Sequence, residues 1–188
     1  MPRTLRNALI PSLAVALALA LAAPGVARAA APAATGDLVR EAVVDGPVDL
    51  VWKLLTTKHG VESWLAPHAD IDLKVGGKMR THADEDGKLG DPNTFVGTIL
   101  SLEPGRMLGV RVDQTPKDTP IAQLAVGTRY DILVDPVDKS RTRVRCIGRG
   151  LASGPAVYAL RPLFDRGADA AFEELEKAVA LRSTPKTK

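Results

Sequence analysis

The sequence has few of the residues that form disulfides, metal centres or nucleophilic sites. Its 188 residues include one cysteine, Cys146, and three histidines. A single cysteine excludes an internal disulfide, and no Cys, His or acidic spacing typical of a zinc or calcium site occurs. The sequence also contains neither a G-x-S-x-G nucleophile motif nor a complete phosphate-binding glycine loop. We therefore expect no catalytic nucleophile, no bound metal and no cofactor.

An excess of one charge is also lacking once the first 29 residues are set aside. Those residues contain three arginines and no acid, which leaves 22 basic and 22 acidic side chains in the remainder. A nucleic-acid-binding surface depends on clustered, unbalanced Lys and Arg side chains. The sequence therefore predicts no nucleic-acid partner.

The longest apolar run lies near the N-terminus, from Ala8 to Ala23. Arg3 and Arg6 precede it, and small residues around Ala29 follow it. This order is typical of a secretory signal peptide, and the run is shorter than the roughly 20 residues that a membrane span needs. We expect cleavage near Ala29, no membrane span in the mature chain, and a periplasmic or secreted protein. An uncleaved N-terminal anchor is the alternative.

The rest of the chain has the organisation of one domain between two short segments that cannot form a core. After the signal peptide of residues 1–29, residues 30–36 form an alanine- and proline-rich linker. Residues 183–188 form a polar tail, which we expect to be disordered. Residues 37–182 have the length of one ordinary domain with a single core.

The start of this domain combines a strand with two short helices. Residues 38–44 have a strand-like, valine-rich pattern. Pro47 is suited to the first position of a helix, and the apolar face of that helix includes Trp52. The same spacing recurs around Trp64 and predicts a second short helix.

The middle of the domain is rich in strands. Residues 71–75 alternate apolar and polar side chains, which predicts a half-buried strand before a turn at Gly76. Residues 95–102 form another strand, in which Gly97 marks a bend or bulge. Arginine occupies every second position from residue 141 to residue 145, so these arginines share one face and the residues between them face the core.

The C-terminal part carries the clearest helical pattern. From Val157 to Ala178, apolar residues recur at spacings of three and four, and charged residues take the opposite side. Such a stripe needs an apolar surface to pack against. Pro162 either bends this helix or delays its start to about Arg161. A long helix lying across the concave face of a curved antiparallel sheet satisfies the pattern.

This order of elements resembles the SRPBCC superfamily, which has a START-like or helix-grip fold. Within it, the chain is similar to the branch of the activator of heat-shock chaperone ATPase and of polyketide cyclases. The matching segments are Pro47 to Trp52, Trp64, the hairpin from Ile71 to Arg80, Gly97 followed by Leu102 to Pro104, and the helix around Phe172 to Leu175. The resemblance implies an α+β fold with a curved antiparallel sheet of about six to seven strands wrapped around a long C-terminal helix. Two short helices follow the first strand.

The resemblance also implies a hydrophobic cavity between the sheet and the terminal helix. Members of the superfamily bind lipids, sterols, polyketides and other apolar molecules, and a minority catalyse cyclisation or hydrolysis. Large apolar side chains with a few polar tips suit such a cavity, although the same residues could simply fill the core. The candidate lining residues are Trp52, Trp64, Met79, Thr81, Phe95, Val110, Tyr130, Tyr158 and Phe164. Residues 114–125 are a candidate lid.

Three functions fit these features. The first is an exported protein that binds a lipid-like or polyketide-like small molecule. The second is an enzyme of the polyketide cyclase or dehydrase type, which needs a buried acid or base. Its candidates, His82 and Asp131, should point outward by strand alternation. The third is a protein-interaction module whose cavity is closed by side chains.

Overall fold

The computed structural model describes residues 37–150 and 155–183 of the chain. The predicted signal peptide and linker, and residues 184–188 of the predicted tail, therefore lie outside the described residues, whereas Ser183 is the last residue of α4. The elements run in the order β1 (Leu38–Val44), α2 (Val48–Thr56), α3 (Lys58–Glu62), β2 (His68–Ile71), β3 (Lys78–His82), β4 (Phe95–Glu103), β5 (Met107–Gln114), η1 (Pro120–Ala125), β6 (Arg129–Pro136), β7 (Thr142–Arg149) and α4 (Pro155–Ser183).

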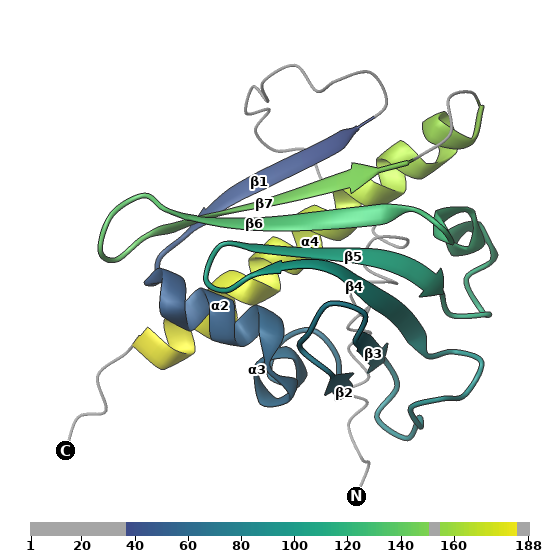
Figure 1. Cartoon of the computed structure of the whole chain (residues 1–188), viewed down its shortest axis with the longest axis horizontal. Helices are drawn as coiled ribbons and strands as arrows, with labels where there is room; N and C mark the ends of the chain where they lie inside the picture. The colour runs from purple at the N-terminus through teal and green to yellow at the C-terminus, as the bar shows by residue number, and fades with distance from the viewer. Residues whose placement is uncertain (1–36, 151–154, 184–188) are drawn as a thin grey trace, which may run out of the picture.

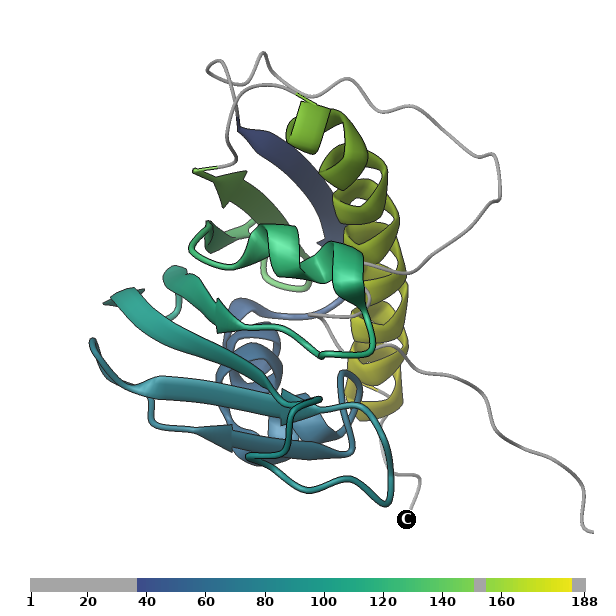
Figure 2. The ribbon, with the colours of Figure 1, turned by 90° about the vertical axis from the view of Figure 1, so that its right-hand side faces the viewer.

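Within these residues, seven strands form one sheet in the order β1-β7-β6-β5-β4-β3-β2, and every neighbouring pair is antiparallel. The sheet curls, and α4 runs along one side of it (Figures 1 and 2). We call the side toward α4 the inner face, which carries Met79, Val110 and Val144. The opposite side, the outer face, faces the viewer in Figure 1. This is the predicted helix-grip architecture.

The corner between β1 and α2 fits closely against the end of α4. Pro47 is the N-cap of α2 and has extended dihedral angles. The helix therefore begins at Val48, one residue later than predicted. A Cβ atom at Gly46 would lie 2.4 Å from Cγ1 of Val179 on α4, so only glycine lets the helix approach this closely. The Thr142 hydroxyl on β7 donates a hydrogen bond to the Gly46 carbonyl at 2.7 Å. The corner thereby joins the edge of the sheet to the terminal helix.

The strand predicted through residue 75 ends earlier, at Ile71. Residues 72–77 form a turn, in which Leu73 is 38% exposed and Val75 is 64% exposed. The turn closes because a hydrogen bond joins the Gly77 amide to the Lys74 carbonyl at 2.9 Å. A Cβ atom at Gly77 would lie 2.0 Å from the Asp72 carbonyl oxygen. The alternation of apolar residues was therefore a wrong guide here, because the close backbone approach makes a turn. The Gly76 amide and the Gly77 carbonyl of this turn bond to Ile99 of β4 at 2.8 Å and 2.9 Å.

Two other predictions concern the interior of longer elements. The register of β4 against β5 shifts between Val96 and Gly97, which confirms an irregularity at this glycine. A Cβ atom at Gly97 would lie 2.4 Å from Cγ1 of Val110, so the bulge accompanies a close packing contact. The terminal helix runs without interruption from Pro155 and contains Pro162, so it does not start near Arg161.

Candidate functional site

The inner face and the short helices form the main apolar core. Buried side chains of the sheet, including Ile99, Leu108 and Val134, meet Leu175 and other residues of α4. The indole Nε1 of Trp64 donates a hydrogen bond to the Leu54 carbonyl at 3.0 Å, so the one polar atom of this ring is satisfied inside the core.

A second, smaller apolar cluster lies at the β7 side of the inner face. The rings of Tyr130 and Phe164 are stacked with a centroid distance of 6.0 Å and an interplanar angle of 9°. A Cβ atom at Gly148 would lie 3.2 Å from Phe164 and 3.3 Å from Tyr130, so glycine leaves room for both rings. Burial raises the pKa of the Tyr130 hydroxyl above its usual value, and it raises the pKa of the neighbouring Cys146 thiol to about 12.

The structure divides the candidate lining residues among different places. Trp64, Met79 and Val110 belong to the main cluster, and Trp52 packs against it while half-buried. Tyr130 and Phe164 belong to the second cluster.

Two further candidates, Thr81 and Phe95, lie outside both clusters. Thr81 and Phe95 are directly opposite each other on β3 and β4. Tyr158 lies on α4, but its side chain is outside the described residues. The candidates thus mark three regions of one inner face rather than a single ring of residues.

Two buried hydroxyl groups at the β3 end have no partner among the described residues. Thr81 is 1% exposed, and its Oγ1 atom makes no hydrogen bond. Thr115, just beyond β5, is 3% exposed, and its Oγ1 atom is likewise without a partner. Buried polar side-chain atoms are normally hydrogen-bonded, so such atoms need an explanation. Sequence reasoning missed Thr115, because nothing in a polar loop shows that one of its residues turns inward.

His82 has the outward orientation that strand alternation predicts, but it is 2% exposed. The loop after β3 covers it, and a Cβ atom at Gly87 would lie 2.0 Å from the imidazole ring. The Asp84 amide donates to His82 Nδ1 at 3.1 Å, which leaves the ring proton on Nε2, directed at Asp91 Oδ1 at 3.0 Å. Both ring nitrogens are therefore occupied, and His82 holds the loop in place.

The outer face carries a row of arginines on adjacent strands. Arg111, Arg129 and Arg149 lie opposite one another on β5, β6 and β7. Asp131 is 4% exposed and forms ion pairs with Arg129 Nε at 2.5 Å and with Arg149 Nε at 2.7 Å. Asp37 also binds Arg149, at 2.6 Å. Asp131 thus points outward as predicted, but it is buried beneath two guanidinium groups.

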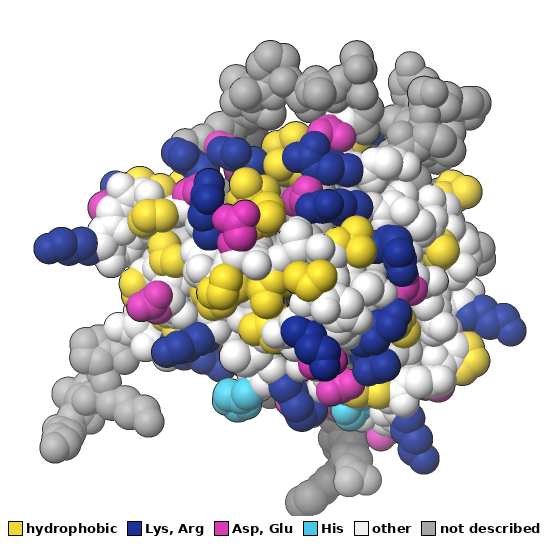
Figure 3. All heavy atoms as spheres, in the orientation of Figure 1, with side chains coloured by type: hydrophobic (Ala, Val, Ile, Leu, Met, Phe, Trp, Pro, Cys, Tyr) yellow, Lys and Arg dark blue, Asp and Glu magenta, His cyan; other side chains and the backbone are white. Residues whose placement is uncertain are grey.

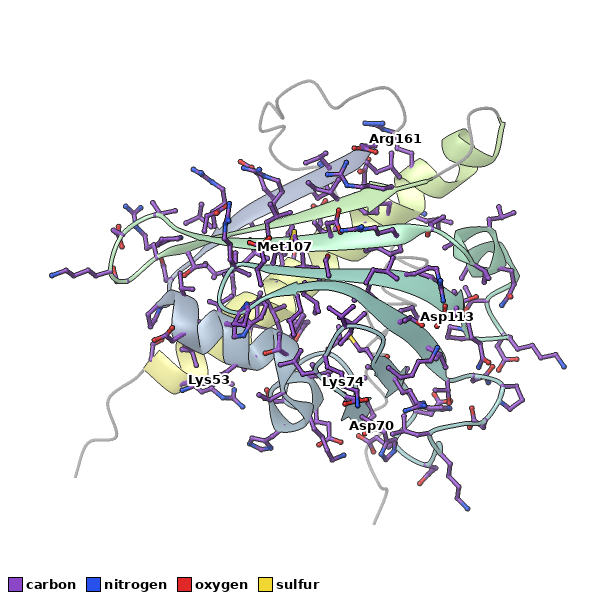
Figure 4. The ribbon with its side chains drawn as sticks, viewed as in Figure 1. Lys53, Asp70, Lys74, Met107, Asp113 and Arg161 are labelled. Carbon is purple, nitrogen blue, oxygen red and sulfur yellow. The ribbon has the colours of Figure 1, made fainter. Side chains whose placement is uncertain are left out.

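The same face carries a second charged group around Asp113, at the far end of β5 (Figure 4). Asp113 accepts hydrogen bonds from Lys78 at 2.8 Å, from Arg111 at 2.9 Å and from the Thr98 hydroxyl. Partial burial opposes ionisation of this carboxyl, but these bonds outweigh it and hold the pKa of Asp113 at about 2. Figure 3 shows Lys and Arg side chains over much of this face, with an apolar band between them.

The arginines predicted to alternate on β7 do so. Thr142, Val144 and Cys146 are buried toward the core, and the intervening arginines lie on the outer face. Arg145 forms an ion pair with Glu41 of β1 at 3.3 Å. Asp131 on the neighbouring strand is paired with Arg129 and Arg149.

The candidate lid, residues 114–125, contains η1, which lies against α4 (Figure 2). Its start is bound to the loop before β4. The Asn93 amide group donates to the Asp118 carboxylate at 2.5 Å, and the Asp118 backbone amide donates back to Asn93 Oδ1 at 3.2 Å. The Gln123 amide group donates to the carbonyls of Thr115 and Pro116. The segment is therefore bound to Asn93 near its start, lies against α4 through η1, and is braced internally by Gln123.

No group of three or more His, Cys, Asp or Glu side chains in residues 37–150 and 155–183 is arranged to hold a metal ion. None of the helices in the same ranges is both long and apolar enough to cross a membrane.

The sequence of this domain also matches a known protein family. The model of the family described as "Activator of Hsp90 ATPase homolog 1-like protein" matches residues 45–180. The chain belongs to this family. The match covers everything from the β1–α2 corner to the last turns of α4, and it confirms the resemblance predicted from the sequence.

Solved structures of this fold include other members of the SRPBCC superfamily. A protein from Mesorhizobium loti has a TM-score of 0.62 and 22% identity, covering 79% of this chain and 98% of that chain. The Zhui aromatase/cyclase from Streptomyces sp. R1128 has a TM-score of 0.57 and 21% identity, covering 79% and 96%. The Aha1 dimer from Colwellia psychrerythraea has a TM-score of 0.58 and 12% identity, covering 79% and 98%. At these identities the likeness shows the fold alone. A search of curated proteins found no significant match.

Proposed function

We propose that this AHSA1-like protein binds a hydrophobic small molecule between the inner face of its sheet and α4. The observation that carries the proposal is the pair of buried, unpartnered hydroxyls of Thr81 and Thr115 beside an apolar surface. Ligand sites combine apolar walls with a few polar groups that orient the bound molecule. The fold supports the proposal, because a structural relative is an aromatase/cyclase.

We further propose that the protein is exported and acts outside the cytoplasm. The support is the basic N-terminal segment, the apolar run from Ala8 to Ala23 and the small residues near Ala29. In that compartment the protein would not meet a cytosolic chaperone. A ligand-binding role is consistent with both the leader and the family.

A cyclase acting in the same place is the second candidate, favoured by the likeness to aromatase/cyclases. A general base must reach the proton that it removes. His82 and Asp131 lie on the outer face and are engaged with partners within the chain. Binding without chemistry therefore ranks ahead of catalysis.

The test is native mass spectrometry of the full-length gene product, expressed in its own host and purified from the envelope fraction. We expect the mass of a polypeptide that begins near Ala30. We also expect an excess mass from a bound apolar compound, which organic solvent extracts. A protein without excess mass, and without a thermal shift against apolar compounds, would contradict the binding proposal and favour a protein-interaction module. A polypeptide retaining residues 1–29 would contradict cleavage.

A further inference from the structure

The two unpartnered threonines lie in one row across three strands. Thr81 on β3 is directly opposite Phe95 on β4. On the other side of β4, the ladder with β5 ends with Val96 opposite Gln114. Continued by one residue, the antiparallel register brings Thr115, which follows β5, to the position opposite Phe95. Residues opposite each other in antiparallel strands project from the same face, and Thr81 shares its face with Met79 of the main core. Thr81, Phe95 and Thr115 therefore form a row on the inner face.

The spacing of the row limits what two hydroxyls can hold together. Two strand separations of about 4.8 Å place the outer members of the row about 10 Å apart. One hydrogen bond of about 2.8 Å from each hydroxyl then leaves about 4 Å between two ligand oxygens. This is close to the separation of 1,3-related oxygens on an aromatic ring. The half-buried Phe95 ring between the threonines offers an apolar surface to the same molecule.

The surroundings of the row are uncharged on the inner face. The next inner positions on β3, β4 and β5 are Met79, Gly97 and Val112. The charged neighbours Lys78 and Asp113 lie on the outer face and bind each other at 2.8 Å. A carboxylate bound at the row would be desolvated with no cation from these strands beside it, which is costly. A neutral hydroxyl or carbonyl oxygen can use a threonine hydroxyl as donor or acceptor.

We propose that Thr81 and Thr115 are the polar end of the ligand site and select an uncharged apolar molecule with two hydroxyl or carbonyl oxygens. This inference rests on the proposed function and narrows its ligand class. It favours an oxygenated ring compound over a hydrocarbon chain that ends in a carboxylate. The segment that carries Thr115 is held by Asn93 and Asp118, so the ligand reaches the row when that contact opens.

The test compares three probes of one shape by isothermal titration calorimetry: naphthalene, 1,3-dihydroxynaphthalene and 2-naphthoate. The variants are Thr81→Val and Thr115→Val, which keep the side-chain shape and remove the hydroxyl. Thr56→Val is the matched control, because Thr56 is equally buried but its hydroxyl donates to the Trp52 carbonyl. Thermal unfolding of each variant checks that it is folded.

We expect wild type to bind the dihydroxy probe at least tenfold more tightly than naphthalene. Each row variant should lose about fivefold for the dihydroxy probe, the worth of one neutral hydrogen bond, and should bind naphthalene as wild type does. Thr56→Val should match wild type for both probes.

Two results would overturn the inference and leave the proposed function standing. In the first, wild type binds naphthalene, and Thr81→Val and Thr115→Val bind the dihydroxy probe as tightly as wild type does. In the second, wild type binds 2-naphthoate more tightly than either other probe. If no probe binds wild type and the envelope-purified protein carries no excess mass, both proposals fail together.

Discussion

The two faces of the sheet differ in the buried polar groups near β3 and β5. On the outer face, Asp131 and Asp113 are each bound by more than one cation. On the inner face, Thr81 and Thr115 have hydroxyls that bind nothing in the described residues. Polar groups satisfied within the chain stabilise the fold, whereas unsatisfied buried groups cost stability and remain available to another molecule. The comparison therefore supports the proposal of a ligand site on the inner face, whereas the paired carboxylates of the outer face stabilise the fold.

The largest expected effect concerns Asp131. Like charges directly opposite each other on neighbouring strands destabilise a sheet, and Asp131 separates Arg129 from Arg149. We expect Asp131→Ala to lower the free energy of unfolding by about 2–4 kcal/mol, below the full value for a buried pair because both arginines are partly exposed. Urea unfolding measures the change.

Asp135→Ala is the control for this variant, because Asp135 lies on the same strand and face but is less buried. Asp135→Ala should lower the free energy of unfolding by clearly less than Asp131→Ala does. Equal losses for the two variants would show that the arginine row does not depend on Asp131.

The second prediction compares one threonine that is satisfied with one that is not. Thr142 is fully buried and donates to the Gly46 carbonyl, so Thr142→Val should cost about 1–3 kcal/mol of unfolding free energy. Thr81→Val removes a hydroxyl without a partner, so it should leave stability unchanged or raise it. Chemical unfolding of both variants without ligand measures the difference. A loss at Thr81 as large as that at Thr142 would mean that the Thr81 hydroxyl is hydrogen-bonded in solution.

The sequence predicted the framework of this fold because the framework depends on apolar spacing. The stripe in α4, the alternation on β7 and the bulge at Gly97 all follow from local patterns. The burial of His82 does not, because it depends on a loop that folds back over an outward-facing residue. The burial of Thr115 was equally hidden, because it depends on how the chain continues after β5. Whether residues of different strands lie side by side depends on how the strands pair, which a single sequence does not show.

A third prediction tests the outer face by pH. The folded-state pKa of Asp113 is about 2, below its ordinary value of 3.8, because of its bonds to Lys78, Thr98 and Arg111. A depressed pKa contributes stability that is complete above pH 3.8 and is lost as the pH falls toward 2. The stability difference between wild type and Asp113→Asn should therefore be constant above about pH 5 and shrink between pH 4 and 2. Urea unfolding across this range measures it.

Asp70→Asn controls for the loss of an exposed carboxylate on the same side of the molecule, where Asp70 binds Arg80. A difference between Asp113→Asn and wild type that stays constant down to pH 2 would show that Asp113 contributes no stability through its ionisation.

The smallest expected signal comes from Cys146, which reports on the other end of the inner face. Burial, with a smaller contribution from Asp131, raises the pKa of its thiol to about 12, so the reactive thiolate is rare at pH 8. We expect a disulfide reagent such as DTNB to react very slowly with the native protein and rapidly in urea. Fast reaction of the native protein would show that the Tyr130–Phe164 cluster opens to solvent.

The same thiol distinguishes the two ends of the inner face. Cys146 lies on β7, and β6, β5 and β4 separate that strand from Thr81 on β3. A dihydroxynaphthalene molecule bound at the threonine row should therefore leave the slow DTNB rate unchanged at saturating probe. Protection of Cys146 by the probe would place the ligand against Tyr130 and Phe164 instead, and would assign the unpaired threonines to the opposite, unoccupied end of the sheet.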